Sequence, residues 1–196
     1  MKTRIDLMAL GVLLRESFSK GVAPPSQALL DAVASLRKSP GSFEQYVVKE
    51  IPHLLRYARS LAKKPEHADD LVQETVYKAL KHADKFEAGT NLSAWLATIL
   101  RNSYISQLRR TRAFEPEEAM GELPTPPHQE AQVELSDVQA ALAELLEEQR
   151  EALLLVSLEG FSYEEVAKIT GVKVGTVKSR VHRARLTLLR ALERSL

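Results

Sequence analysis

Apolar residues recur at helical spacing along almost the whole of this 196-residue chain, and that spacing limits the fold more than any other feature. In residues 174–188, for example, the apolar positions keep the 3.6-residue period of an amphipathic helix: Val177, Val181, Ala184 and Leu188. No segment shows the sustained alternation of apolar and polar residues that is typical of a half-buried strand. The sequence therefore predicts an all-α protein.

A proline-rich acidic segment divides the helical pattern into two parts. Residues 114–132 contain four prolines and one glycine and have no hydrophobic period, which is typical of a solvated, partly stiff linker. A softer break, Ser-Pro-Gly-Ser, lies at residues 39–42. We therefore predict two small helical domains, joined by a flexible acidic linker and preceded by a helical extension: 1–42 (extension), 43–112 (first domain), 113–132 (linker) and 133–196 (second domain).

The net charge of +1 conceals a strong segregation of charge along the chain. Residues 1–42 carry +3, residues 43–112 carry +4, residues 113–151 carry −10, and residues 152–196 carry +4. Two basic blocks separated by an acidic one indicate a polyanion bound at two places. The alternative is that the acidic block only keeps a linker solvated. The acidic block is also expected to lie along the basic faces of the free protein and to screen them in a salt-dependent way.

Composition excludes several classes of function. The chain has no cysteine, and its five histidines show no metal-binding spacing. It also has no glycine-rich phosphate loop, so we expect no metal, no cofactor and no catalysis. The longest apolar stretch, residues 7–14, is far shorter than a membrane span and lacks a signal-peptide cleavage site, so we expect a cytoplasmic protein without a membrane partner.

The middle block predicts a helix over 43–61, kinked or broken at Pro52, and a second helix from Pro65. The exposed face of the second helix carries Asp70 and Glu74, which repel each other at i,i+4 spacing. A basic partner would relieve that repulsion. The alternative for the acids near the start of this helix is a favourable interaction with the helix dipole.

A third helix is predicted after an N-cap near Asn91, and it combines aromatic and basic residues. Trp95 lies on its apolar stripe, where a tryptophan is often simply a core residue. Its other face and its end carry Arg101, Asn102 and Arg109, and the preceding loop contributes an aromatic side chain. Aromatic and basic residues together are what unstacked nucleic-acid bases bind.

The last block has the spacing of a helix-turn-helix. Predicted helices near 133–146 and 149–158 are followed by Ser162 and Glu165, which form a capping-box pattern, and then by Gly171 at the turn. Opposite its apolar stripe, the final helix carries hydroxyl and basic side chains, which suit the base edges and phosphates of a DNA major groove. The alternative is a solvated basic helix in an ordinary bundle.

Four stretches of the chain resemble bacterial sigma factors of the extracytoplasmic-function group, most nearly the EcfG type of the alphaproteobacterial general stress response: residues 69–75 (DDLVQET), 91–102 (NLSAWLATILRN), 160–167 (GFSYEEVA) and 174–185 (VGTVKSRVHRAR). The resemblance implies that 43–112 is sigma region 2 and that 133–194 is sigma region 4. It implies a factor that directs core RNA polymerase to stress promoters and initiates transcription.

The resemblance also implies the site residues. The β′ clamp helices of core polymerase would bind Asp69, Asp70, Gln73 and Glu74. The −10 element would be opened and held by Lys85, Phe86, Asn91, Trp95, Arg101, Asn102 and Arg109. The −35 element would be read by Lys173, Thr176, Lys178, Ser179, Arg180, His182 and Arg183. Further implied partners are the β flap of polymerase, promoter DNA and an anti-sigma factor of the NepR type.

Two other functions stay open from the sequence. A sigma mimic would titrate an anti-sigma factor without touching a promoter, but it would not need the basic recognition face. A plain helix-turn-helix repressor would leave the block around Trp95 unexplained. Residues 13–18 and 25–36 of the extension are two short amphipathic stretches with a faint similarity to NepR-type proteins, and a plain extension is the alternative to a tethered inhibitor.

Overall fold

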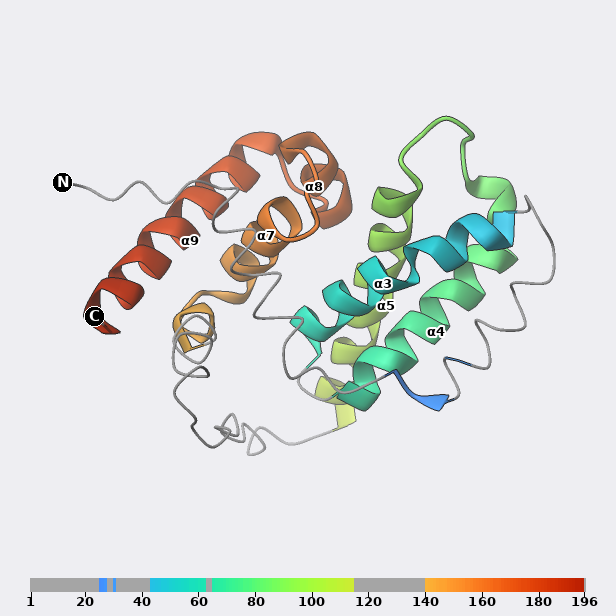
Figure 1. Ribbon diagram of the computed structural model, residues 1–196, viewed down its shortest axis with the longest axis horizontal. Helices are drawn as coiled ribbons and strands as arrows, with labels where there is room; N and C mark the ends of the chain where they lie inside the picture. The colour runs from blue at the N-terminus through green and yellow to red at the C-terminus, as the bar shows by residue number, and fades with distance from the viewer. Residues whose placement is uncertain (1–24, 28–29, 31–42, 63–64, 115–139, 196) are drawn as a thin grey trace.

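The computed structural model describes residues 25–27, 30, 43–62, 65–114 and 140–195. Within these ranges all regular secondary structure is helical and no strand occurs, which confirms the predicted all-α class. Figure 1 shows two helical units, one on either side of the molecule. The first comes from the middle of the sequence and the second from its C-terminal third.

The first unit contains α3 (Phe43–Leu61), α4 (Pro65–Lys81), a 3₁₀ turn η1 (Ala83–Lys85) and α5 (Leu92–Phe114). The three α-helices pack on one another through aliphatic side chains such as Val47, Leu71, Leu96 and Leu100. Of the two predicted outcomes at Pro52, a kink or a break, the break is wrong, because α3 runs through this residue. Pro52 is exposed, while its neighbours Ile51 and Leu54 are buried, so packing on either side holds the helix together.

The second unit contains α7 (Glu147–Ser157), α8 (Tyr163–Thr170) and α9 (Val174–Ser195). A helical segment over 140–143 precedes α7, inside the helix predicted over 133–146. Burial confirms the apolar stripe predicted for α9, since every member is at most 1% exposed: Val177, Val181, Ala184 and Leu188. This stripe faces α7 and α8, so α9 turns its hydroxyl and basic residues away from the core.

The corner between α8 and α9 has the geometry that its sequence predicts. The Ser162 hydroxyl accepts a hydrogen bond from the Glu165 N–H, and the Glu165 carboxylate accepts one from the Ser162 N–H, which completes the capping box. Gly171 ends α8 with φ +71°, a left-handed backbone conformation that residues with a Cβ rarely adopt. These two local devices fix where α8 begins and ends.

We expect Ser162→Ala to lower the free energy of unfolding by about 1 kcal/mol, because the first turn of α8 loses its cap. The measurement is urea unfolding followed by circular dichroism. Ser106→Ala is the matched control, since Ser106 is exposed within α5 and its hydroxyl donates only to the Asn102 carbonyl. The control should be neutral or slightly stabilising. Equal losses in both variants would contradict the capping role.

The two units contact each other directly. Helix α5 lies along α8, and the C-terminal half of α3 approaches α7. The interdomain contact therefore joins the helix that carries Trp95 and Arg101 to the domain that carries the helix-turn-helix. Local sequence patterns do not predict this contact, because the helices that form it are far apart along the chain.

Several predicted segments lie outside the described residues. These are the linker beyond residue 114, the helix over 133–146 up to residue 139, and nearly all of the N-terminal extension. Helix α5 extends to Phe114, slightly past the predicted domain limit. Among the described helices, none has the length and apolar character to cross a membrane.

Candidate functional site

The outer face of α9 presents the residues predicted to read DNA. Lys178, His182 and Arg183 are exposed, and so is Lys173 in the turn before the helix. Thr176, Ser179 and Arg180 are half-buried. The seven predicted residues therefore lie in the first half of α9 and in the turn before it.

Two of these side chains are oriented by neighbouring helices. An Arg180 guanidinium nitrogen lies 3.2 Å from a Glu148 carboxylate oxygen on α7. The Lys178 ammonium lies 6.0 Å from the centre of the Tyr163 ring, at the outer limit of a cation–π contact. Arg180 is thus partly neutralised in this arrangement, while Arg183 is exposed.

Trp95 lies in an aromatic cluster at the start of the first unit. Its ring centre is 5.5 Å from that of Phe86 and 6.2 Å from that of Phe43, and the two phenylalanines are 5.7 Å apart. Trp95 remains half-buried rather than fully enclosed. The sequence indicated Trp95 and Phe86 but not Phe43, which reaches them from the first turn of α3.

Asn91 has two roles at the start of α5. Its side-chain oxygen accepts a hydrogen bond from the Ala94 N–H at 3.2 Å, which is the predicted N-cap. Its amide nitrogen donates across the interdomain contact to the Glu165 carboxylate at 2.5 Å. The same side chain therefore caps one domain and ties it to the other.

The fold favours the charged form of the Glu165 carboxylate. Burial alone would raise the pKa of Glu165, but hydrogen bonds from the Ser162 backbone and the Asn91 amide outweigh burial and lower that pKa below its ordinary 4.5. A carboxyl group whose pKa is lowered by folding stabilises the fold above its unfolded pKa. That contribution is lost as the pH falls through the lowered value.

Arg101 is not free in this arrangement. Its Nε and Nη2 atoms donate to the two oxygens of Glu151 on α7, at 2.8 and 3.3 Å. The Tyr57 hydroxyl donates to the same carboxylate at 3.0 Å. Burial, followed by the negative charge of Glu151, raises the pKa of Tyr57 well above its ordinary 10.0. Asn102 and Arg109 lie exposed farther along α5, as does Lys85 in η1.

A cleft of about 490 Å³ opens between the two units beside these residues. Its walls include Lys85, Asn91 and Trp95 from the first unit and Glu165 and Lys168 from the second. Four residues predicted for the −10 element are thus adjacent in space: Lys85, Phe86, Asn91 and Trp95. The cleft has one wall from each domain, so its width depends on the interdomain contact.

The acidic face of α4 is only partly as predicted. Asp70 is exposed, whereas Gln73 and Glu74 are half-buried. The basic partner that Glu74 needs is Lys78 of its own helix, at 2.6 Å, and Gln107 of α5 donates to the other carboxylate oxygen at 2.8 Å. The hydrogen bond from Lys78 is the main reason that the pKa of Glu74 is lowered.

Asp69 does not belong to this exposed face, and its prediction as a surface contact needs correction. It is only 5% exposed, and one carboxylate oxygen accepts a hydrogen bond from the backbone N–H of Ser26. The helical turn of α4 points Asp69 inward and Asp70 outward, because adjacent residues lie about 100° apart on a helix. The acidic pair therefore has one inner and one outer member.

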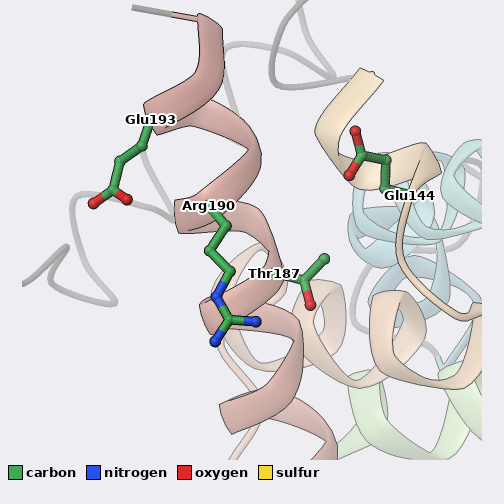
Figure 2. Close-up of a pocket in the computed structure, with 4 residues that line it drawn as sticks. All are labelled: Glu144, Thr187, Arg190 and Glu193. Carbon is green, nitrogen blue, oxygen red and sulfur yellow. The ribbon is translucent and has the colours of Figure 1, made fainter.

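A second hollow of about 620 Å³ lies far from these residues, between α9 and the turn before α7. Figure 2 shows its four lining side chains, with Glu144 and Glu193 on opposite sides and Arg190 and Thr187 on α9 between them. They do not converge on a common point. Nor does any group of His, Asp and Glu side chains within the described ranges have the arrangement of a metal site.

The interdomain contact contains functional candidates that the sequence did not indicate. Arg56 on α3 donates to both oxygens of Glu159, from Nε at 3.3 Å and from Nη2 at 3.0 Å. His53 Nδ1 lies 3.2 Å from the same carboxylate. Glu159 follows Arg56 by more than a hundred residues, so no spacing rule in the sequence could have paired them.

Two family models match the chain, one for each of the two helical units. The model of sigma-70 region 2 matches residues 47–114, and the model of sigma-70 region 4 matches residues 135–188. The first match covers α4, α5 and nearly all of α3, and the second covers α7, α8 and most of α9.

Individual proteins agree with the family models. The ECF RNA polymerase sigma factor EcfG of Rhodopseudomonas palustris is 47% identical over 151 residues, which cover 75% of this chain and 83% of that protein. Among solved structures, the sigma factor RpoE of Bartonella quintana in complex with the anti-sigma factor NepR aligns with a TM-score of 0.68 and 43% identity, over 77% of this chain and 96% of that one. CnrH in complex with the cytosolic domain of CnrY aligns at a TM-score of 0.59 and 28% identity, over 85% of this chain and 96% of that one.

Proposed function

This chain belongs to the extracytoplasmic-function RNA polymerase sigma factors, and from that premise we propose which of its surfaces performs each part of initiation. Sigma factors are non-catalytic initiation factors, so the protein is not an enzyme. It directs core RNA polymerase to promoters and initiates transcription there.

Residues 43–112 act as region 2 and residues 133–196 as region 4, with 113–132 as the linker between them and 1–42 as an extension. Region 2 binds the β′ clamp helices through the exposed face of α4, formed by Asp70, Gln73 and Glu74. Asp69 supports this face from inside the domain. Region 4 binds the β flap as well as DNA. The exposed carboxylate of Asp70 supports this assignment, since it offers a charge to a basic partner.

The −10 element is opened and held by α5 and the loop before it. The aromatic cluster of Phe43, Phe86 and Trp95 offers faces on which an extruded base can stack. The surrounding polar and basic groups hold the strand: Lys85, Asn91, Arg101, Asn102 and Arg109. Arg101 reaches this role only after it has left Glu151.

The −35 element is read by α9, and the exposure pattern of this helix carries the proposal. Its apolar stripe is buried, while Lys178, His182 and Arg183 face solvent next to a glycine turn. The side chains that contact DNA are Lys173, Thr176, Lys178, Ser179, Arg180, His182 and Arg183. A helix of this kind places basic and hydroxyl groups against base edges and phosphates.

The promoters are those of a general stress response, and a NepR-like anti-sigma factor holds the protein inactive in the cytoplasm, where RNA polymerase works. The similarity to EcfG of Rhodopseudomonas palustris supports the first point. The second is supported by the similarity to RpoE of Bartonella quintana, which was solved in complex with NepR. A partner that bridges both domains would gain effective concentration from their linkage.

A runoff transcription assay with core RNA polymerase and a stress promoter tests the proposed function. A sigma factor yields a transcript that depends on both the −10 and the −35 sequences. A sigma mimic yields no transcript but relieves inhibition of another sigma factor by its anti-sigma factor. A helix-turn-helix repressor binds DNA without polymerase and lowers transcription.

We expect Arg183→Ala to weaken binding of the protein to a −35 duplex by about 1–3 kcal/mol, because an arginine that reads a base edge contributes that much discrimination. Arg180→Ala should act in the same direction. Lys178→Ala should instead lower affinity evenly across sequences and reduce the salt slope by about one unit, because it neutralises a phosphate. Fluorescence anisotropy with cognate and scrambled duplexes separates the two effects. Equal losses on both duplexes for all three variants would show that α9 reads no base.

A further inference from the structure

The interdomain contact is built from acids on one side and hydrogen-bond donors on the other. Region 4 contributes the carboxylates of Glu147, Glu151, Glu159 and Glu165. Region 2 contributes their partners, namely Tyr104, Arg101, Tyr57, Arg56 and Asn91. Two of these acids, Glu147 and Glu151, belong to the acidic block of residues 113–151, whereas Glu159 and Glu165 lie in the block that follows it.

Two of these contacts are bidentate, and their carboxylates are almost fully buried. Arg101 holds both oxygens of Glu151, and Arg56 holds both oxygens of Glu159. Glu151 is 8% exposed, and the Glu159 side chain is 3% exposed. The Tyr57 hydroxyl adds a third donor to Glu151. We call Arg56, Tyr57 and Arg101 the anion face of region 2.

The anion face is suited to phosphate as well as to carboxylate. A guanidinium presents parallel N–H donors that fit the paired oxygens of either group, and a phenol can donate to either. Arg101 lies on α5 together with Trp95 and with the helix cap Asn91, two residues proposed to hold the −10 strand, so the anion face shares a helix with the proposed nucleic-acid surface. Arg56 extends the surface onto α3.

The carboxylates of region 4 are not a permanent requirement of the fold. Burying an ion pair costs desolvation that offsets most of its Coulomb attraction, so such a pair fixes a geometry more than it adds net stability. When region 4 leaves, the two arginines lose their carboxylates but return to water, where another anion can bind them. Another anion can therefore replace the carboxylates of region 4 on the two arginines.

We propose that the anion face formed by Arg56, Tyr57 and Arg101 is a binding site for the phosphodiester backbone of the promoter strand, and that Glu151 and Glu159 occupy it in the free protein as internal competitors. This inference rests on the proposed role of region 2 in binding the −10 element. It adds Arg56 and Tyr57 to the nucleic-acid contacts. It also makes separation of the domains and loading of DNA one coupled step.

The test uses the full-length free protein and a fluorescein-labelled single-stranded oligonucleotide of −10 sequence, with binding measured by anisotropy. Removing both acids with Glu151→Gln and Glu159→Gln should tighten binding by about tenfold, since a ligand that needs a minor conformation binds more weakly by the fraction of that conformation. The double variant Glu164→Gln and Glu193→Gln is the matched control, because both residues are exposed acids of region 4 and their loss changes the net charge by the same two units. The control should leave binding unchanged.

Substitution of Arg56 distinguishes a phosphate-binding site from a contact that only holds region 4. In the double glutamine background, Arg56→Gln should weaken binding by about fivefold and reduce the slope of log affinity against log salt by about 0.7, the value for one phosphate contact on a single strand. If Arg56 served only to hold region 4, this third substitution would change neither quantity. That result would overturn the phosphate site. Should the double variant fail to fold, Glu159→Gln alone frees Arg56 and gives the same comparison.

Domain separation is measured independently by energy transfer between dyes on Lys49→Cys and Glu193→Cys, two exposed positions in a chain that has no native cysteine. The double glutamine variant, and saturating oligonucleotide on the wild type, should both lower the transfer. Lower transfer without tighter DNA binding would overturn the competition. Runoff transcription by the wild type is measured in parallel. Its failure would refute the sigma function itself, whereas normal transcription with unchanged DNA binding in the variants refutes only this inference.

Discussion

Replacing Asp70 by lysine should strongly weaken the binding of this sigma factor to core RNA polymerase. Asp70 is an exposed acid of α4, and α4 packs on α3 and α5 through its opposite side. Losing one member of an interfacial charge pair costs about 2–5 kcal/mol, and reversing its charge adds repulsion. We therefore expect the dissociation constant to rise by about a hundredfold or more, measured by titration of labelled protein with core enzyme.

The comparison with neighbouring acids makes this result specific. Glu74→Lys should also impair binding, but Glu74 is bonded to Lys78 and Gln107, so this second variant would also disturb the packing of α4 on α5. Asp70→Lys is the cleaner variant for that reason. Glu193→Lys is the control, since it reverses an exposed acid in the last turn of α9, where a cation is favourable. Wild-type affinity of the Asp70→Lys variant would exclude α4 as the docking surface.

Leu188→Asp should destabilise region 4 by more than about 4 kcal/mol and abolish transcription that depends on the −35 element, because it buries an unpaired charge in the core. Leu188 is 1% exposed. Leu186 lies two residues earlier on α9 and is 41% exposed, so Leu186→Asp makes the same chemical change at the surface. It should cost less than about 1 kcal/mol.

Thermal unfolding by circular dichroism, together with the runoff assay, measures both variants. Similar losses of stability at the two positions would mean that the buried stripe of α9 does not hold region 4 together. Unfolding of Leu188→Asp with retained −35 recognition would contradict the proposal that the helix-turn-helix must be folded to read DNA.

The helices themselves could be predicted because their signals are local. The apolar period of α9, the capping box of Ser162 and Glu165, and the left-handed Gly171 each involve residues within one or two turns of each other. The N-cap at Asn91 is equally local. The helix does not break at Pro52, because a helix anchored on both sides by buried residues tolerates one missing hydrogen bond.

The partner of Glu74 was within reach of the sequence, since Lys78 lies at i,i+4. The inward direction of Asp69 was not, because the acidic run gives no sign of where the core lies on α4. Only part of the aromatic cluster could be predicted from the sequence. Trp95 and Phe86 are near each other along the chain, but Phe43 joins them only through packing of α3 on α5.

By itself, the sequence determined the all-α class, the helix-turn-helix and the order of two basic blocks around an acidic one, because composition, period and caps act over a few residues. Only the tertiary structure decided which charges meet. Arg101 and Glu151 are 50 residues apart in the chain, and Arg56 and Glu159 are 103 apart. Pairs at such separations are set by how two domains pack, and packing depends on the shapes of whole faces rather than on any local pattern.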